Sequence, residues 1–304
     1  MKTFRTGIVV AKIVARIRGG IGNQLFIYAA ARRLALVSDA ELVLDAASGF
    51  AYDTQYNQRY QLEHFHIPCR TATAAERLEP FSRARRYLKR RANMFRPIEK
   101  QTYHQQQRID YDPRLLQLQL HGTLYLEGYW QSEDYFKDVE ATIRQDLRIR
   151  APSDDANQTL VGHIRSHAAV AVHVRFFDEP QTSGIDNAPG DYYQRAIVDL
   201  DRRVPGAHYY VFSDRPEAAR SRVPLPDRRL TLVSHNQGDS LAYADLWLMT
   251  QCRHFIIANS TFSWWGAWLA EHPDKQVIAP GFEKRNGKTS WGFGGLLPER
   301  WTKL

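Results

Sequence analysis

Polar side chains that can bind phosphate or sugar follow an apolar run in the second half of the chain. The run AVAVHVRF at Ala169–Phe176 carries His173 and Arg175 near its carboxyl end, and Asp178 follows shortly after. A guanidinium group presents a planar fork that matches phosphate oxygens, so Arg175 is a candidate clamp for a pyrophosphate. The alternative interpretation is an arginine that pairs with a nearby carboxylate.

Asp214 is a second candidate, because it ends the apolar segment Val211–Asp214. A carboxylate at the end of a strand can accept hydrogen bonds from ribose hydroxyls or from the amino edge of guanine. The alternative is an N-cap for a following helix whose first turn holds Pro216 and Glu217.

The segment FIIANSTFSWWGAWLA at Phe255–Ala270 predicts a strand that runs into a tryptophan-rich helix. Asn259, Ser260, Thr261 and Ser263 lie at the junction. Hydroxyl groups and free N–H groups at a helix N-terminus form an anion site, which favours a role beside a diphosphate. The alternative is ordinary capping above a tryptophan-filled core, and the tryptophans serve packing on either interpretation.

The glycine-rich turn Gly19–Asn23 is the fourth candidate. It is not a phosphate-binding P-loop, because no Gly-Lys-Ser/Thr follows, and its spacing differs from that of a dinucleotide-binding turn. Its glycines favour close approach of the backbone to a ligand.

Buried β-branched runs that alternate with helical patterns must position these residues. The run KIVARI at Lys12–Ile17 predicts a buried parallel strand. Further strands are predicted at Glu41–Asp45, Thr123–Tyr129, Ala169–Phe176, His208–Phe212, Leu230–Val233, His254–Ala258 and Gln276–Ala279. Helical patterns lie at Gln24–Val37, Ser132–Leu147, Tyr192–Leu200, Leu241–Gln251 and Phe262–Glu271. This alternation predicts an α/β fold with parallel sheets that bind ligands at strand carboxyl ends.

The length of 304 residues predicts two domains, which we place at residues 1–152 and 153–304. Ala151–Asp155, with its proline and small polar residues, is the expected linker. The two cysteines, Cys69 and Cys252, form no metal-ligand pattern and are expected to be free thiols, although a disulfide stays an alternative.

The chain is expected to be cytoplasmic. No apolar run is long enough to span a bilayer. The start, Met1–Ile17, lacks the pattern of a cleaved signal peptide, because Lys12 interrupts its apolar stretch and no small-residue cleavage site follows.

The net charge of +8 has its densest source in Ser82–Lys100, which contains eight basic residues. One interpretation is a solvated helix face. The other is a patch that contacts anionic membrane, since each Lys or Arg near such a surface contributes about 1 kcal/mol of attraction. No nucleic-acid-binding motif accompanies the charge, so a nucleic-acid partner is not expected.

The motifs together resemble the α-1,2-fucosyltransferases of glycosyltransferase family eleven. GGIGNQLFIYAAARRLA at Gly19–Ala35 is similar to the opening motif of that family. Matching segments follow in the same order at Tyr60–Ile67, Leu126–Phe136, Asp191–Ile197, Val211–Asp214 and Asp245–Leu269.

This resemblance implies a fold of the GT-B type, in which two Rossmann-like domains face a cleft. It implies an N-terminal acceptor domain, a C-terminal donor domain, a GDP-fucose donor and no metal or other cofactor. The acceptor implied is the 2-hydroxyl of a terminal galactose, on a galactoside or a lipid-linked oligosaccharide, with inversion at the transferred sugar.

The resemblance also implies roles for the candidate residues. Arg175 would bind the donor phosphates, and His173 would line the nucleotide site. Asp214 would contact guanosine, the turn Asn259–Ser263 would flank the diphosphate, and Asn23 would lie across the cleft. Asp178 is the candidate general base, or it orients Arg175.

One motif departs from the family pattern. The usual His-x-Arg-Arg-Gly-Asp reads His173-Val174-Arg175-Phe176-Phe177-Asp178 here. A different acceptor, linkage or donor sugar is therefore an alternative, and a catalytically silent relative that binds a sugar nucleotide is another.

Overall fold

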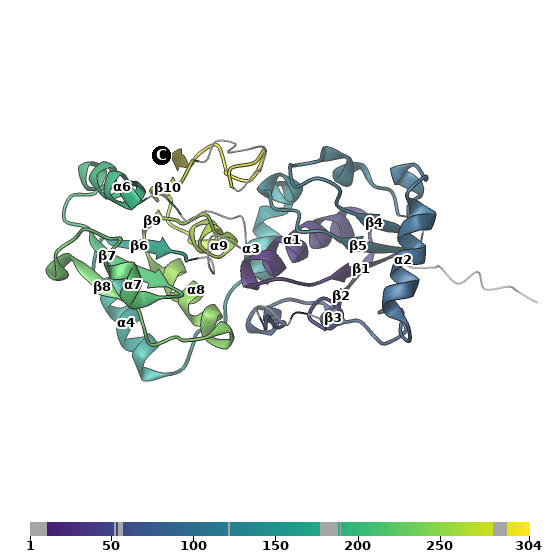
Figure 1. The fold of residues 1–304 in the computed structure, drawn as a ribbon, viewed down its shortest axis with the longest axis horizontal. Coiled ribbons are helices and arrows are strands. Elements are labelled where there is room, and N and C mark those ends of the chain that lie inside the picture. The colour runs from purple at the N-terminus through teal and green to yellow at the C-terminus, as the bar shows by residue number, and fades with distance from the viewer. Residues whose placement is uncertain are drawn as a thin grey trace, which may run out of the picture.

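A computed structural model describes residues 11–51, 53, 57–120, 122–176, 188, 190–281 and 291–304. Two parallel β-sheets form the framework, each in its own lobe, with helices α1 (Ile21–Val37) and α9 (Thr261–Leu269) between the lobes (Figure 1). The predicted α/β class with two parallel sheets is confirmed.

The first sheet has the strand order β3-β2-β1-β5-β4, and all neighbouring strands are parallel. Its strands are β1 (Lys12–Arg16), β2 (Glu41–Asp45), β3 (Arg70–Thr71), β4 (Tyr103–Gln105) and β5 (Thr123–Glu127). The short edge strands β3 and β4 were not predicted, because two or three polar residues carry no alternating pattern.

The second sheet has the order β11-β10-β9-β6-β7-β8 and is also parallel. Its strands are β6 (Ala169–Val174), β7 (His208–Ser213), β8 (Leu230–Leu232), β9 (His254–Ile256), β10 (Val277–Ala279) and β11 (Thr302–Lys303). Five of them coincide with predicted strands, and β11 was missed.

Alternation along β1 explains how helices cover both faces of the first sheet. Ile13 and Ala15 face the core that contains α1, whereas Val14 faces the opposite side, where α2 (Ser82–Asn93) lies. The Nζ atom of Lys89, on α2, lies 5.0 Å from the ring centroid of Tyr125 on that side.

Helices cover both faces of the second sheet as well. The helices are α4 (Asp155–Arg165), α6 (Gly190–Arg203), α7 (Pro216–Arg220) and α8 (Ala242–Gln251), in addition to α9. Apolar residues of α4, α8 and α9 share one buried cluster, and those of α6 and α7 share another.

The chain from Ser132 to Leu147 is not the continuous helix that the sequence predicts. It forms two short 3-10 turns and then α3 (Glu140–Asp146), with a break at Phe136, whose φ of −149° is not helical. This break buries the Phe136 ring, which stacks 5.5 Å from the ring of Trp265. Ser132 caps the first of these turns by accepting a hydrogen bond from the backbone N–H of Asp134. The remaining 3-10 segments are Leu62–His64, Ile98–Lys100, Pro113–Gln117, Asp227–Arg229 and Asp239–Leu241.

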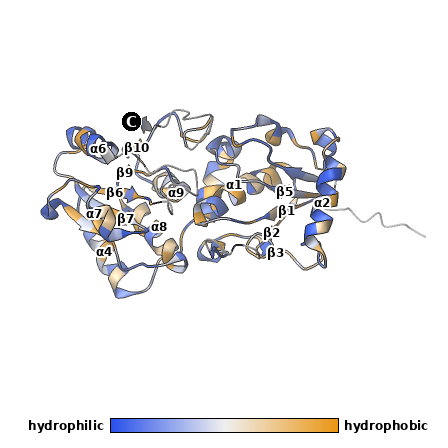
Figure 2. Cartoon of the chain, viewed as in Figure 1, coloured by the Kyte–Doolittle hydropathy of each residue, from blue (hydrophilic) through white to orange (hydrophobic). Residues whose placement is uncertain are grey.

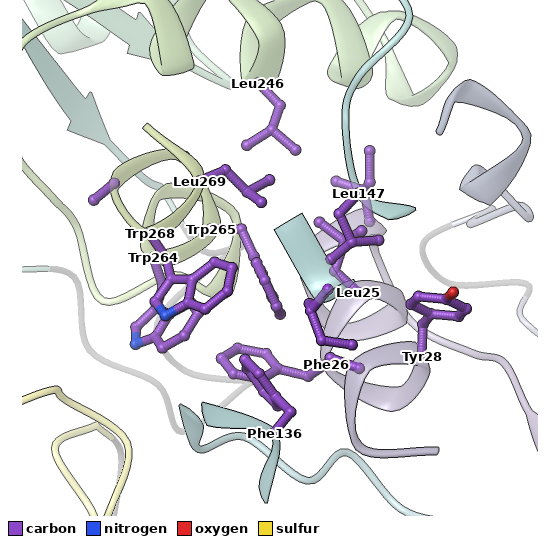
Figure 3. Packing of buried hydrophobic residues seen from close by; sticks show 14 of the residues in the cluster. Leu25, Phe26, Tyr28, Phe136, Leu147, Leu246, Trp264, Trp265, Trp268 and Leu269 are labelled. Carbon is purple, nitrogen blue, oxygen red and sulfur yellow. The ribbon is translucent and has the colours of Figure 1, made fainter. Parts of the chain in front are cut away.

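One apolar core is continuous between the lobes (Figure 3). The ring of Phe26 on α1 lies 4.5 Å from that of Trp264 and 4.9 Å from that of Trp265, both on α9. These residues are fully buried. The two lobes therefore meet through hydrophobic packing rather than through a solvated hinge.

Candidate functional site

Three neighbouring strands of the second sheet deliver the predicted phosphate-binding residues to one edge. β6 lies between β9 and β7, with His173 opposite Phe212 in the register of β6 and β7. All three strands run in the same direction, so the residues after them emerge together. In open parallel sheets, ligands bind at this carboxyl edge.

Arg175 and Asp214 lie side by side at this edge. A guanidinium nitrogen of Arg175 is 2.9 Å from Asp214 Oδ2, and the backbone N–H of Phe176 donates to Asp214 Oδ1 at 3.0 Å. Both side chains keep part of their surface exposed, 34% and 25%. Asp214 does not cap α7: the N-cap position is Arg215, and no side chain there caps the helix. The pair holds the start of the segment after β6 and leaves Arg175 accessible to a ligand.

His173 lies beneath this pair, with 4% of its surface exposed. Burial first, and the nearby charge of Arg175 second, lower the pKa of its imidazole to about 3. Its ring centroid is 5.3 Å from that of Phe262, and among the described residues no group hydrogen-bonds to its Nδ1 atom. A neutral imidazole with an unused nitrogen at this position can line a ligand site but cannot supply positive charge.

The turn Asn259–Ser263 forms the start of α9. Ser260 is the N-cap, and its hydroxyl accepts from the N–H of Phe262 at 3.3 Å. Ser263 is fully buried and donates its hydroxyl to the carbonyl of Ser260. Asn259 is buried next to them. The two serine hydroxyls therefore shape the helix start, and the positive end of the helix dipole is directed at this edge.

The start of α1 meets the start of α9 at Gly22. A Cβ atom at Gly22 would lie 2.5 Å from the carbonyl carbon of Thr261 and 2.6 Å from the backbone nitrogen of Phe262. Only glycine permits this approach of two backbones. Two helix N-termini, one from each lobe, are thereby brought together.

Asn23 connects the lobes at the same place. Its Oδ1 atom accepts from Gln131 Nε2 at 2.7 Å and from the hydroxyl of Thr261 at 3.3 Å. The structure therefore brings together Asn23, Thr261 and the start of α9, while Arg175, Asp214 and His173 gather at the neighbouring strand ends. Asp178 lies outside the described residues.

Gln24 is a site-supporting residue that sequence reasoning missed. It is fully buried, and its Nε2 atom donates to the carbonyls of Gly19 and Arg59, each at 2.8 Å. Its Oε1 atom accepts from the N–H of Gln61. These bonds hold the glycine turn in place. A glutamine on an otherwise apolar helix face was the available signal.

The altered motif has a local consequence at Phe176. Phe176 stands where the family motif has its second arginine. The guanidinium carbon of Arg222 lies 5.8 Å from the centroid of the Phe176 ring. A second arginine thus contacts the residue next to Arg175, although it comes from the segment after α7.

Two lobes, each built on a parallel sheet, with a polar site at the strand ends are the arrangement of the GT-B fold. The chain matches the family described as Glycosyl transferase family 11 over residues 12–288, and it belongs to that family.

Named relatives agree with this assignment. An alpha-1,2-colitosyltransferase of Escherichia coli is 27% identical over 96% of this chain and 98% of its own length. The O-antigen biosynthesis glycosyltransferase WbnK of Escherichia coli is 27% identical over 86% of this chain and 91% of its own. The crystal structure of NodZ alpha-1,6-fucosyltransferase co-crystallised with GDP shares the fold, with a TM-score of 0.51 and 15% identity over 88% of this chain and 95% of that one.

Within the described residues, no helix combines the length and the apolar character needed to cross a bilayer.

Proposed function

We propose that this glycosyltransferase moves L-fucose from GDP-fucose to a sugar hydroxyl, the 2-hydroxyl of a terminal galactose, in the synthesis of a surface glycan or O-antigen. The observation that carries the proposal is the carboxyl edge of the second sheet, where Arg175 pairs with Asp214 and the ring of His173 lies against Phe262 at the start of α9. That helix start meets the start of α1 at Gly22. The family membership and the fucosyltransferase that shares the fold support it.

The proposed chemistry is a single inverting displacement. The acceptor oxygen attacks the anomeric carbon on the side opposite GDP, the bond to the phosphate oxygen breaks, and the acceptor proton goes to a base or to solvent. Negative charge grows on the leaving diphosphate. Arg175 and the N–H groups at the two helix starts would stabilise that charge, which is the role that cations and helix N-termini commonly serve.

Roles for the other site residues follow from this chemistry. His173, held neutral, would line the nucleotide pocket, and Asp214 would contact guanosine as well as orient Arg175. Asn259, Ser260, Thr261 and Ser263 would shape the diphosphate site, Asn23 would approach the reacting sugar, and Asp178 is proposed as the general base. No metal or cofactor would be needed beyond the donor.

A second donor sugar, colitose, is favoured by one observation. The relative that matches nearly the whole chain is named as an alpha-1,2-colitosyltransferase. The replacement of the second arginine and the glycine of the motif by Phe176 and Phe177 is consistent with an altered sugar or acceptor pocket.

Calorimetric titration with GDP, UDP, ADP and CMP, followed by a transfer assay with GDP-fucose and galactosides, tests the proposal. Selective GDP binding and transfer that EDTA leaves unchanged are expected. Preference for another nucleotide would overturn the donor, and activity lost in EDTA and restored by manganese would overturn metal independence. GDP binding without transfer from either GDP-fucose or GDP-colitose would identify a silent relative.

We also propose that α2 places the enzyme on the cytoplasmic face of an anionic membrane, where a lipid-linked acceptor would lie. The hydrophilic colour over much of α2 in Figure 2 reflects its basic residues. Large apolar side chains are nevertheless exposed on and beside this helix, including Phe81 (78%), Leu88 (64%) and Phe95 (83%). Basic residues combined with exposed aromatic and aliphatic side chains are typical of interfacial helices.

A further inference from the structure

A charged layer lies between α2 and the first sheet, at the carboxyl ends of its central strands. β1, β2 and β5 end in Arg16, Asp45 and Glu127. Because side chains alternate along a strand, these three point to the same face as Val14, which is the face that α2 covers. Apolar packing beneath α2 therefore gives way to charge at the ligand-binding edge of the sheet.

Four arginines line a pocket of about 270 Å³ in this layer. They are Arg16 from β1 and Arg83, Arg86 and Arg90 from α2. The α2 residues are spaced at i, i+3 and i+7, so they share one face of the helix. We name this the arginine pocket.

Two carboxylates near the arginine pocket are already engaged. Glu127 accepts hydrogen bonds from Arg16 and from the hydroxyl of Tyr103. Asp45 accepts from Ser48 through both its backbone N–H and its hydroxyl, and it forms an ion pair with Arg86 at 3.3 Å. Arg86 also donates to the backbone carbonyl of Arg77 at 3.0 Å.

Arg90 carries a positive charge that no carboxylate of the described residues balances by direct contact. Within the part of the chain that the structure describes, Arg90 forms no ion pair, and its Nε atom is buried without an acceptor. Its recorded bond is a 3.4 Å contact with Gln105. Arg86 has only 6% of its surface exposed. Asp45 compensates Arg86, whereas the buried Nε atom of Arg90 has no acceptor among the described residues. A buried guanidinium nitrogen is costly unless an acceptor compensates it, so the Arg90 side of the arginine pocket is prepared for a negative ligand.

We propose that the arginine pocket binds an anionic group, phosphate or carboxylate, on the acceptor. The inference rests on the proposed glycosyl transfer, because only that reaction has an acceptor. The arginine pocket is placed on the acceptor side because β1 leads directly from Arg16 into the glycine turn Gly19–Asn23, beside the proposed reaction site. The donor phosphates are assigned to Arg175 on the other sheet, so this pocket serves a second anion. The two sources are an acidic sugar of the glycan and the diphosphate of a lipid-linked acceptor.

Calorimetry in the presence of saturating GDP tests the proposal with two probes, inorganic pyrophosphate and methyl β-glucuronide. Arg90→Ala should weaken the binding of at least one probe about 10-fold or more, since it removes charge-assisted hydrogen bonds. Arg91→Ala removes the same charge from an exposed position of the same helix and should change affinity less than about twofold if direct contact rather than net charge matters.

The outcomes distinguish the two sources of the anion, and they distinguish failure of the arginine pocket from failure of the proposed glycosyl transfer. Binding of pyrophosphate alone supports the lipid-linked diphosphate, and binding of the glucuronide alone supports an acidic sugar. Failure of both probes to bind, or equal binding by the folded Arg90→Ala variant, would overturn the pocket's role. The affinity for GDP should be the same in Arg90→Ala as in the wild type. If the wild-type protein binds a probe but does not bind GDP, the arginine pocket stands and only the proposed transfer reaction is refuted.

Discussion

Arg175 is the residue whose loss tests the donor site most directly. Its guanidinium pairs with Asp214 and remains one-third exposed, so it can turn to a phosphate without unfolding its surroundings. Arg175→Ala should lower kcat by about 10²–10³, because a donor that acts on the charge of the transition state is lost. Arg175→Lys should recover part of this, since an ammonium group cannot make the bidentate contact.

Steady-state kinetics, GDP calorimetry and circular dichroism measure the Arg175 effects. Arg202→Ala, on the exposed surface of α6, is the control for loss of one positive charge from the same domain. A folded Arg175→Ala variant with unaltered kcat and GDP affinity would show that the pair with Asp214 is purely structural.

His173 should make stability depend on pH. Its pKa is lowered to about 3 in the folded protein, against 6.5 for the free side chain. Between these values the unfolded chain binds a proton that the folded chain rejects, so stability falls as the pH drops from about 6.5 towards 3. The slope from one such group approaches about 1.4 kcal/mol per pH unit.

Urea unfolding at several pH values, in the wild type and in His173→Gln, isolates this contribution. The variant should show a shallower loss of stability on acidification. His66→Gln, at an exposed position, should retain the wild-type slope. Identical slopes in the wild type and His173→Gln would contradict the prediction.

At the scale of elements, the meeting of α1 and α9 depends on the missing side chain of Gly22. Gly22→Ala would place Cβ against the backbone of Thr261 and should destabilise the protein by about 1–3 kcal/mol, as overpacking does. Gly162→Ala in α4 is the matched control, because its Cβ meets nothing within 4 Å. That change should stabilise by about 0.5–1 kcal/mol. Thermal melts compare the two, and equal effects would refute the close approach.

The α2 segment should bind vesicles through both charge and apolar contact. The triple variant Phe81→Ala, Leu88→Ala, Phe95→Ala should lose at least about 10-fold in affinity for anionic vesicles, because each buried apolar side chain contributes about 1.5–3 kcal/mol. Val37→Ala, exposed at the end of α1, is the control. Co-sedimentation at low and high salt separates the electrostatic from the apolar contribution to vesicle binding. Equal pelleting with neutral and anionic vesicles would show that charge attraction does not contribute.

At the scale of the whole molecule, the continuous core predicts that both lobes unfold together. Phe26 from one lobe packs against Trp264 and Trp265 from the other. Phe26→Ala should therefore cost about 3–5 kcal/mol and lower a single calorimetric transition. Phe95→Ala, a change at an exposed ring, should leave that transition in place. Two separate transitions in the wild type would show that the proposed domains 1–152 and 153–304 fold independently.

The sequence by itself determined the strand and helix alternation and the class of site. β-branched runs such as Ala169–Val174 must be buried on both sides, so they predict parallel strands wherever they occur. Polar residues directly after such runs, Arg175 and Asp214 among them, must then collect at one sheet edge. These inferences need only the hydrophobic pattern along the sequence and the common direction of parallel strands.

Tertiary structure alone decided the contacts between distant segments. The break at Phe136 exists because its ring is buried against Trp265, which no pattern within Ser132–Leu147 encodes. The same is true of the pair formed by Arg175 and Asp214, and of the approach of Gly22 to Thr261, residues far apart in the chain. Local propensity is worth tenths of a kcal/mol per residue, and packing of large side chains outweighs it by roughly tenfold.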